Sequence, residues 1–260
     1  MSDSAVVLAF DSSTEWLSVA LDLGDARVFE RTEPGGARAS QRLLPLVAEL
    51  LSDAGLELRD VGLIGFGAGP GAFTGLRAAC AAAQGLGRGL ERPVVAVPTL
   101  LAVAVAAEPA AHAPRVLVAN DARMGELYWA VVDAQGAQAA SWKLAEPARV
   151  QSPREAAAGW LAQFGAEPVS DLCLCGNAWA EHAPALREAL GPGWEAALRA
   201  ARVVAPGAGA VARLARAAHA RGESVAAALA RPLYVRDKVA LTSDERARAK
   251  AATSAGRSPA

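Results

Sequence analysis

The chain has 260 residues, enough for one large domain or two smaller ones, and a folded chain of this length buries roughly 70–75% of its surface without disulfides or metals. Its 26 basic and 27 acidic residues give a net charge of −1, which excludes a strong overall attraction to nucleic-acid phosphates. No apolar run reaches the ~18 residues of a membrane helix, and the start MSDS lacks the basic residues of a secretion signal, so we expect a cytoplasmic protein.

The first predicted elements are three strands, at residues 6–10, 16–21 and 27–32, separated by polar turns. The turn DSST at 11–14 places Asp11 and three hydroxyls at the tip of a hairpin. This tip resembles the first phosphate loop of actin- and hexokinase-like ATPases. Those loops usually hold a glycine, and here Ser12 and Ser13 fill the turn. A plain turn, in which Asp11 accepts a local hydrogen bond, is therefore the stronger interpretation.

A helix is predicted at 40–54, and its apolar arc is unusually wide. At 100° per residue the arc spans roughly 160°, whereas a stripe of about 100° covers one core face. The arc consists of Leu43, Leu44, Leu46, Val47, Leu50 and Leu51. We therefore expect part of it to contact a second surface besides the core.

The stretch 61–90 is the most informative part of the chain. A strand at 61–66 leads into GAGPG at 67–71, and a helix is expected to open near Thr74, whose hydroxyl would cap the first amides. Such an arrangement suits anions. Three specific motifs are nevertheless absent. No acid follows the next strand at 94–97, as a dinucleotide-binding fingerprint requires, and no lysine follows the glycines, as a Walker loop requires. GAFTG at 71–75 lacks the serine of a nucleophile elbow. A tight structural turn stays an open alternative.

The helix that follows these glycines has a smooth second face. One apolar stripe is suited to the core, yet the opposite face carries mainly the small residues Ala78, Ala81, Ala82, Gly85 and Gly89. Three helix glycines cost about 1 kcal/mol each relative to alanine. Small residues at this spacing let another helix approach closely. That helix can be 40–54 of the same chain or belong to another protein, and both possibilities stay open.

A proline-containing break at 108–114 separates two predicted halves, 1–107 and 108–241, and residues 242–260 lack apolar periodicity and are predicted to be a disordered tail. The second half should contain a strand at 115–119, a polar loop at 120–126, strands at 127–132, near 137–144 and at 171–175, and helices at 152–164, 178–190 and 208–221. The helix at 152 opens with SPRE, a capping box.

We find no catalytic or metal-binding constellation in the sequence. The three histidines, His112, His182 and His219, are scattered among surface-type segments and are expected to be solvated. The cysteines Cys80, Cys173 and Cys175 are expected to pack in the core. The best remaining polar cluster is NDAR at 120–123, at a strand end where α/β proteins place sites, although such a cluster is more often structural.

Five segments, in order along the chain, resemble the TsaB family, whose members take part in making threonylcarbamoyladenosine in bacterial tRNA. They are LAFDSSTEWLSVAL at 8–21, SQRLLP at 40–45, GPGAFTGLR at 69–77, DARMGE at 121–126 and PLYVR at 232–236. The third is specific to this family and its catalytic relative TsaD. The matching loop residues are Asp11, Gly69, Pro70, Gly71, Phe73, Thr74 and Gly75. The resemblance implies an α/β fold of two ribonuclease-H-like halves, related to the actin and hexokinase superfamily.

The sequence departs from its relatives in two places. Ala39 stands where many members of the family have a histidine just before SQRLLP. Thr99 and Val103 occupy the positions of the metal-binding His-x-x-x-His pair of TsaD, and neither can replace an imidazole ligand.

The resemblance implies an accessory, non-catalytic subunit without a cofactor or metal of its own. It would bind TsaD and, with it, the ATPase TsaE, and support transfer of a threonylcarbamoyl group to the adenosine beside the anticodon. It would contact tRNA only through the complex, have no membrane partner, and possess the surface for a homodimer when alone. The competing hypothesis is a small-molecule kinase or ATPase that uses Asp11 and residues 69–74 as phosphate loops.

TsaB and TsaD join, as the resemblance implies, through helices of their first halves. The predicted contact residues therefore come from the helices 40–54 and 74–90. They are Leu43, Leu44, Val47, Leu50, Leu51, Arg77, Ala78, Ala81, Ala82 and Gly85.

Overall fold

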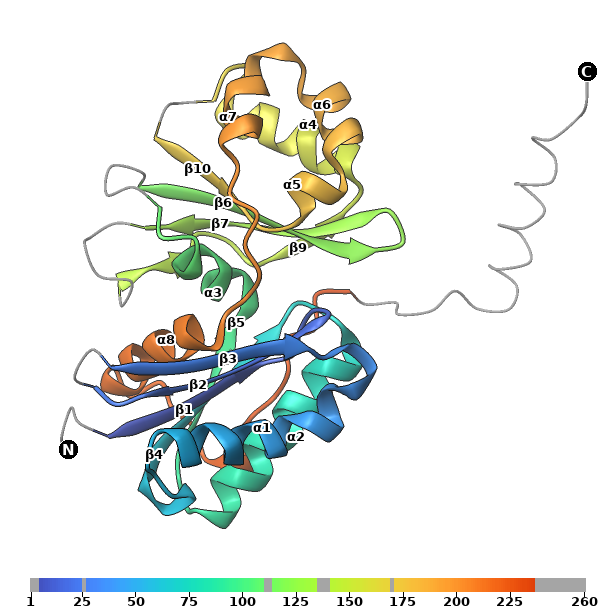
Figure 1. The fold of residues 1–260 in the computed structure, drawn as a ribbon. Coiled ribbons are helices and arrows are strands. Elements are labelled where there is room, and N and C mark those ends of the chain that lie inside the picture. The colour runs from blue at the N-terminus through green and yellow to red at the C-terminus, as the bar shows by residue number, and fades with distance from the viewer. Residues whose placement is uncertain (1–4, 25–26, 110–113, 135–140, 169–170, 237–260) are drawn as a thin grey trace, which may run out of the picture.

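The computed structural model describes residues 5–24, 27–109, 114–134, 141–168 and 171–236. The predicted tail at 242–260 and part of the strand predicted near 137–144 lie outside these residues. The chain forms two lobes, each built on a five-stranded sheet, stacked one above the other in Figure 1.

The first lobe holds a sheet with the strand order β3-β2-β1-β4-β5. The strands are β1 (Val6–Asp11), β2 (Trp16–Asp22), β3 (Val28–Pro34), β4 (Val61–Gly69) and β5 (Val94–Pro98). Alternate residues of β1 face opposite ways, as a strand requires. Leu8 and Phe10 pack on the helices α1 (Ala39–Asp53) and α2 (Phe73–Gly89), and Val7 and Ala9 pack on α3 (Thr99–Ala106) and α8 (Ala208–Ala220).

The second lobe repeats the β3-β2-β1-β4 part of this strand order. Its sheet runs β10-β6-β7-β8, and β9 also pairs with β7. As β1 is antiparallel to β2 and parallel to β4, so β6 is antiparallel to β7 and parallel to β10. The strands are β6 (Arg115–Arg123), β7 (Glu126–Asp133), β8 (Lys143–Leu144), β9 (Arg149–Gln151) and β10 (Leu172–Cys175). The repetition agrees with two related halves.

Four helices cover the outer face of the second sheet: α4 (Pro153–Phe164), α5 (Ala178–Glu181), α6 (Ala183–Leu190) and α7 (Glu195–Ala200). They bury a core of aromatic residues in which Trp160 lies edge-on to Trp129 and beside Trp179, with ring centroids 5.6 and 5.1 Å apart. Trp160 of α4 therefore packs on the sheet through Trp129 and on α5 through Trp179.

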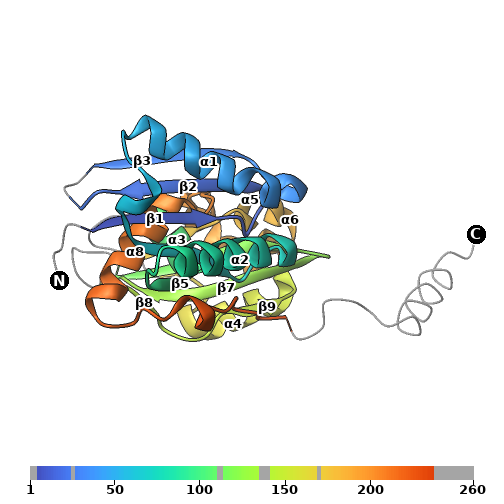
Figure 2. The same ribbon diagram turned by 90° about the horizontal axis from the view of Figure 1, so that it is seen from below.

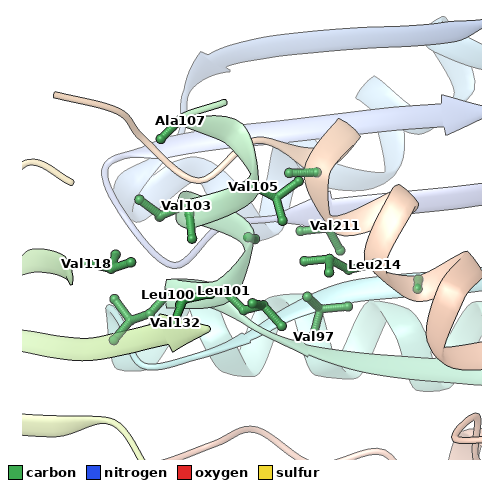
Figure 3. Packing of buried hydrophobic residues seen from close by; sticks show 14 of the residues in the cluster. Val97, Leu100, Leu101, Val103, Val105, Ala107, Val118, Val132, Val211 and Leu214 are labelled. Atoms are coloured by element: carbon green, nitrogen blue, oxygen red, sulfur yellow. The ribbon is translucent and has the colours of Figure 1, made fainter. Parts of the chain in front are cut away.

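Helix α3 packs against both lobes, and it can do so because its side chains are apolar on every side. All its residues from Thr99 to Val105 are buried, as expected for a helix enclosed by protein. Figure 3 shows Leu100 close to Val118 and Val132 of the second sheet, while Val105 points toward Val211 of α8. One cluster of buried side chains therefore continues from the first lobe to the second.

Helix α8 comes late in the chain but packs on the first sheet, against β1, β2 and β4. Its first amide, that of Ala208, donates to Ser18 Oγ at 3.0 Å, and Arg216 Nε donates to Asp22 Oδ2 at 3.0 Å. The predicted division at residue 107 follows the order of the sequence, whereas the lobes are not two continuous pieces of chain. In space, residues 208–236 run back along the first lobe.

The capping box of α4 is present as predicted, with Ser152 and Glu155 each accepting from the other's backbone amide. Thr74, in contrast, is not the cap of α2. The helix begins one residue earlier, at Phe73, after Ala72, which makes no side-chain cap bond. Strand β4 continues through the glycines to Gly69, since small residues do not prevent strand pairing with β5.

Two further expectations were wrong in detail, and one helix was missed. Residues 120–123, predicted as a loop, belong to β6, so that only Met124 and Gly125 form the turn to β7. The helix predicted at 178–190 is interrupted at His182, next to the Ala183-Pro184 start of α6. Helix α7 was not predicted, because it is short. In the described part of the chain, no helix is long and apolar enough to cross a membrane.

Ser18 is expected to be a stability hot spot, because one buried hydroxyl links three elements. Ser18 Oγ donates to Glu30 and accepts from Thr32 Oγ1 and from the amide of Ala208. Ser18→Ala leaves that buried amide without its acceptor and should lower the free energy of unfolding by about 1–3 kcal/mol. Denaturant unfolding measures this loss. The exposed Ser52→Ala should change stability by less than about 0.5 kcal/mol, and an equal loss in both variants would contradict the role of Ser18.

Candidate functional site

Two loops meet at the edge of the first sheet, and backbone contacts join them. One is the hairpin turn after β1, and the other is the glycine-rich segment between β4 and α2. The amide of Ala72 donates to Ser13 O at 2.6 Å, and Ser12 Oγ donates to Gly75 O at 2.9 Å. One main-chain and one side-chain hydrogen bond thereby join residues that are more than fifty positions apart.

The glycines of this segment make room for the hairpin turn. A Cβ added to Gly75 would overlap Ser12 O, and one added to Gly71 would overlap Ser13 O. Gly69 has a φ of +120° and lies against the carbonyl of Leu233. The glycines thus permit close packing between parts of the same chain.

Asp11 is buried beneath this contact and has no share in the cleft surface described below. Its Oδ1 accepts from the amide and the hydroxyl of Ser13, at 2.8 and 2.6 Å. Thr99 Oγ1 lies 3.4 Å from Oδ2, and a Cβ on Gly67 would overlap the same oxygen. Burial raises the pKa of the Asp11 carboxyl, against the opposing effect of the hydrogen bonds from Ser13.

The loop geometry favours the structural interpretation over a phosphate site. A phosphate loop offers free backbone amides to its ligand. Here the amide of Ser13 binds Asp11, that of Ala72 binds Ser13 O, and that of Gly69 binds Thr99 Oγ1 at 3.1 Å. The hairpin tip is therefore the Asx-type turn predicted as the stronger alternative.

Two substitutions of Asp11 should change the folding stability in opposite directions. Asp11→Ala removes the acceptor of a buried amide and should destabilise by about 1–3 kcal/mol. Asp11→Asn keeps a carbonyl oxygen in that place and removes the cost of burying a charge. Because the folded pKa is raised, the wild-type carboxyl favours folding at pH values below its unfolded pKa of about 3.9 and loses this contribution as pH rises through the folded pKa.

The stability of Asp11→Asn relative to wild type should therefore increase between about pH 4 and the raised pKa and stay constant above it. Urea unfolding of both proteins across this range measures the difference, in which the other carboxyl groups cancel. A relative stability that falls with rising pH would show that the carboxylate form of Asp11 is the one the fold requires.

A cleft of about 350 Å³ lies between the lobes, next to the two loops. The first lobe contributes the hairpin tip, the start of α2 and the segment 233–236, and the second contributes the β6–β7 hairpin and Asn177. Arg123 reaches across the cleft and pairs with Glu15 at 3.6 Å, while its other nitrogen lies 3.3 Å from Asp121.

Asp121 is the centre of the polar cluster on the second lobe. His182 Nε2 lies 3.0 Å from the Asp121 carboxylate, and the backbone amide of Asp121 donates to Asn177 Oδ1 at 2.8 Å. The expectation of a solvated His182 was wrong, since its side chain is only 14% exposed. No local pattern indicated this pair, because 61 positions separate its members. Asp121 also accepts from the amide of Arg123, so this cluster positions the β6–β7 turn.

The β6–β7 turn itself is conformationally costly. Arg123 pairs with Glu126, and the two residues between them, Met124 and Gly125, have φ angles of 58° and 77°. Arg123 also has a positive φ, of 62°. A left-handed conformation costs a residue with a side chain about 1–2 kcal/mol, and turns of this kind favour Asn-Gly or Gly-Gly. Met124 is nevertheless present there, with its side chain 72% exposed.

The segment 230–236 connects the far end of α2 with the second lobe. Gln84 Nε2 donates to Ala230 O at 3.0 Å, and the amide of Leu233 donates to Ala68 O at 2.7 Å. Tyr234 then packs on Phe73, with ring centroids 5.4 Å apart. Finally, Arg236 pairs with Glu126 of the second lobe. We call residues 230–236 the strap. The motif PLYVR at 232–236 was the sequence signal for it.

Helices α1 and α2 lie side by side over the first sheet, as Figure 2 shows. A groove of about 360 Å³ separates their outer surfaces. Leu44, which is 52% exposed, stands on one side of the groove, and the space above Gly85 is open for at least 4 Å. The full lining is Ser40, Leu43, Leu44, Ala78, Ala81, Ala82, Gly85 and Leu86.

Four predicted contact residues are buried in the core, and of these only Leu43 also lines the groove. Leu43, Val47, Leu50 and Leu51 are at most 5% exposed and pack against the strands of the first sheet. The leucine arc is wide because α1 packs on the sheet with one side and beside α2 with the next. The predicted Leu44, Ala78, Ala81, Ala82 and Gly85 do line the groove, with Arg77 exposed beside it.

The structure gives no support to a metal centre. Within the ranges that the structure describes, no three His, Cys, Asp or Glu side chains gather as a metal site requires. Thr99 is bound to Gly69 and Asp11, and Val103 is buried in α3. Burial raises the pKa of the Cys175 thiol well above its ordinary value, as suits a cysteine packed in the core.

Comparisons with known proteins give the family. A family model described as TsaD, tRNA N6-adenosine threonylcarbamoyltransferase, matches residues 34–243. The tRNA threonylcarbamoyladenosine biosynthesis protein TsaB of Escherichia coli K12 is 36% identical over 244 residues, which are 90% of this chain and 96% of that protein. The chain belongs to the TsaB family.

Two solved structures from Pseudomonas aeruginosa resemble this member of the TsaB family. An uncharacterized protein described as similar to the peptidase YeaZ has a TM-score of 0.72 and 37% identity, and covers 89% of this chain and 100% of its own. YeaZ has a TM-score of 0.69 and 36% identity, with 88% and 100% covered. Together with the repeated strand order, these matches confirm the predicted two-lobed α/β fold of the actin and hexokinase superfamily.

Proposed function

We propose that this chain is a non-catalytic subunit in tRNA threonylcarbamoyladenosine biosynthesis. It binds TsaD, and with it TsaE, in the cytoplasm, and supports transfer of the threonylcarbamoyl group to the adenosine beside the anticodon. It holds no cofactor of its own and meets tRNA through the complex. Membership of the TsaB family supports the pathway, and the open groove between α1 and α2 is the observation that carries the partner role.

The groove fits a helix of a partner protein. Its floor consists of alanine and glycine, so a second helix can approach closely, and Leu44 offers an apolar ridge for the neighbouring groove of that helix. In the described structure no atom lies within 4 Å of a Cβ placed on Gly85, so packing within the chain does not explain this glycine. The same surface would support a weaker homodimer when the partner is absent.

The competing hypothesis of a small-molecule kinase or ATPase is disfavoured by the two loops. Their backbone amides at Ser13, Gly69 and Ala72 already have acceptors within the protein. Phosphate binding would require breaking these buried hydrogen bonds. Asp11 would also have to leave a site in which it is only 1% exposed.

Gly85→Arg tests the groove. A long charged side chain in the apolar groove should abolish co-purification of TsaD, because an unpaired charge cannot be buried there. The thermal melt should stay within a few degrees of wild type, since a Cβ at Gly85 meets no atom within 4 Å. Pull-down from the protein's own cells and a melt of each variant provide the measurement.

Gly159→Arg is the matched control, because Gly159 is an exposed helix glycine of α4 with the same open surroundings but on the second lobe. It should leave the complex intact. Equal loss of TsaD in both variants, or undiminished binding by Gly85→Arg, would remove the groove as the contact site. In sedimentation experiments, any homodimer of the lone chain should also dissociate in Gly85→Arg.

The isolated protein should neither hydrolyse ATP nor bind tRNA tightly. Non-specific affinity for nucleic acid comes mainly from neutralised phosphates, and a net charge of −1 provides little of it. A phosphate-release assay and a gel shift at physiological salt measure both activities. Turnover that Asp11→Asn abolishes would favour the kinase hypothesis, and submicromolar tRNA binding by the lone chain would contradict an accessory role.

A further inference from the structure

The β6–β7 turn presents an exposed apolar side chain on an unfavourable backbone. Met124 has the largest exposed fraction, 72%, of the large apolar side chains that the structure describes. Its φ of 58° is one that Asn or Gly adopts with less strain. Both features oppose stability and solubility, and neither is needed to connect two strands, for which Asn-Gly would suffice. Features that violate local preference in this way point to function.

The turn is held in place from both lobes. Arg123 links it to Asp121 on its own lobe and to Glu15 on the other. From the strap, Arg236 Nη2 donates to Ala122 O at 3.2 Å, and its Nη1 lies 3.8 Å from Met124 Sδ. The methionine is therefore presented beside Arg123 and Arg236, two residues that line the interlobe cleft.

A continuous row of side chains leads from the groove to this turn. Phe73, Arg77 and Ala81 follow one another at intervals of four residues along α2 and thus share one line of its surface. Ala81 lines the groove, Arg77 stacks over Phe73, and Arg77 Nε donates to the hydroxyl of Tyr234 at 3.2 Å. Tyr234 is 49% exposed and lies two residues from Arg236, the neighbour of Met124.

The composition of this row is that of a protein contact. Tyrosine, phenylalanine, methionine and arginine are enriched at the centres of protein interfaces, and tyrosine and arginine supply many of their energetic hot spots. The row contains all four and is continuous with the groove. RNA fits less well, because the acids Glu15, Asp121 and Glu126 balance the local cations Arg77, Arg123 and Arg236.

We propose that the protein which fills the groove between α1 and α2 also contacts the second lobe through Met124, and so covers the mouth of the interlobe cleft. This inference rests on the proposed function. The partner presents an apolar socket to Met124 and an apolar or aromatic surface to Tyr234. Because it touches both lobes, binding fixes their relative orientation.

Met124→Asn separates a contact role from a structural one. The substitution creates the Asn-Gly pair that such turns prefer, so the thermal melt should stay equal or rise, while the apolar side chain is lost. Affinity for the purified partner, TsaD, should fall about tenfold, mainly through faster dissociation in surface plasmon resonance. Met124→Gly, also compatible with a positive φ, should behave alike.

Val203→Asn is the matched control, because Val203 is 63% exposed but follows α7 on the second lobe, outside the row. It should leave the affinity unchanged. In hydrogen exchange of the full-length complex, the amides at 123–126 should be protected by TsaD together with those of α2.

The outcomes separate this inference from the proposed function. Loss of binding in Gly85→Arg with full binding in Met124→Asn and Met124→Gly would overturn the second contact and leave the groove standing. Loss in the Met124 variants alone would support the turn and refute the groove. Unchanged TsaD affinity with a loss of tRNA or of TsaE from the assembled complex would assign the turn to another component and overturn the inference.

Discussion

The main-chain contact between the hairpin turn and the start of α2 is the constraint on which the functional surfaces depend. Gly71 and Gly75 let α2 begin directly against Ser12 and Ser13, at a distance that no side chain permits. This contact fixes where α2 lies relative to the first sheet. The groove beside α1, the packing of Tyr234 on Phe73 and one wall of the interlobe cleft all follow from that position.

The two lobes share a strand order but differ at the equivalent positions of their first strands. In the first lobe Asp11 ends β1 against Gly67, and in the second Asn120 lies near the end of β6 with its Oδ1 close to Gly176. Asp11 is bound by Ser13, whereas Asn120 Oδ1 is buried without a hydrogen-bond partner within the described structure. Asp11 therefore belongs to an internal hydrogen-bond network, whereas Asn120 keeps an unused acceptor at the corresponding place of the second lobe.

The order of strands and helices was largely predictable, because it depends on local periodicity. Strands β1 to β5 and helices α1, α2, α4 and α8 appeared near their predicted places. The contacts that build the cleft were not predictable in this way. His182 meets Asp121, and Arg77 meets Tyr234, across 61 and 157 positions. Only the fold brings such residues together, and only the motif PLYVR indicated that the strap mattered.

The leucine arc of α1 shows why a surface is harder to predict than an element. Periodicity indicates which residues avoid water, but it does not say whether a sheet, a neighbouring helix or another protein covers them. Here the sheet and α2 account for Leu43, Val47, Leu50 and Leu51, and only Leu44 remains outside. On α2 the small residues gave the better signal, because a glycine without a close neighbour has no packing role within its own chain.

The strap makes the groove and the cleft parts of one surface. It follows α2 from Gln84 to Phe73, and then binds the second lobe through Arg236. Tyr234 and Arg236 therefore connect α2 with the β6–β7 hairpin by contacts separate from the apolar core around α3. A protein seated on α2, as proposed, would meet a surface whose far end belongs to the other lobe, and the arrangement of the lobes and the fit of that partner would then depend on each other.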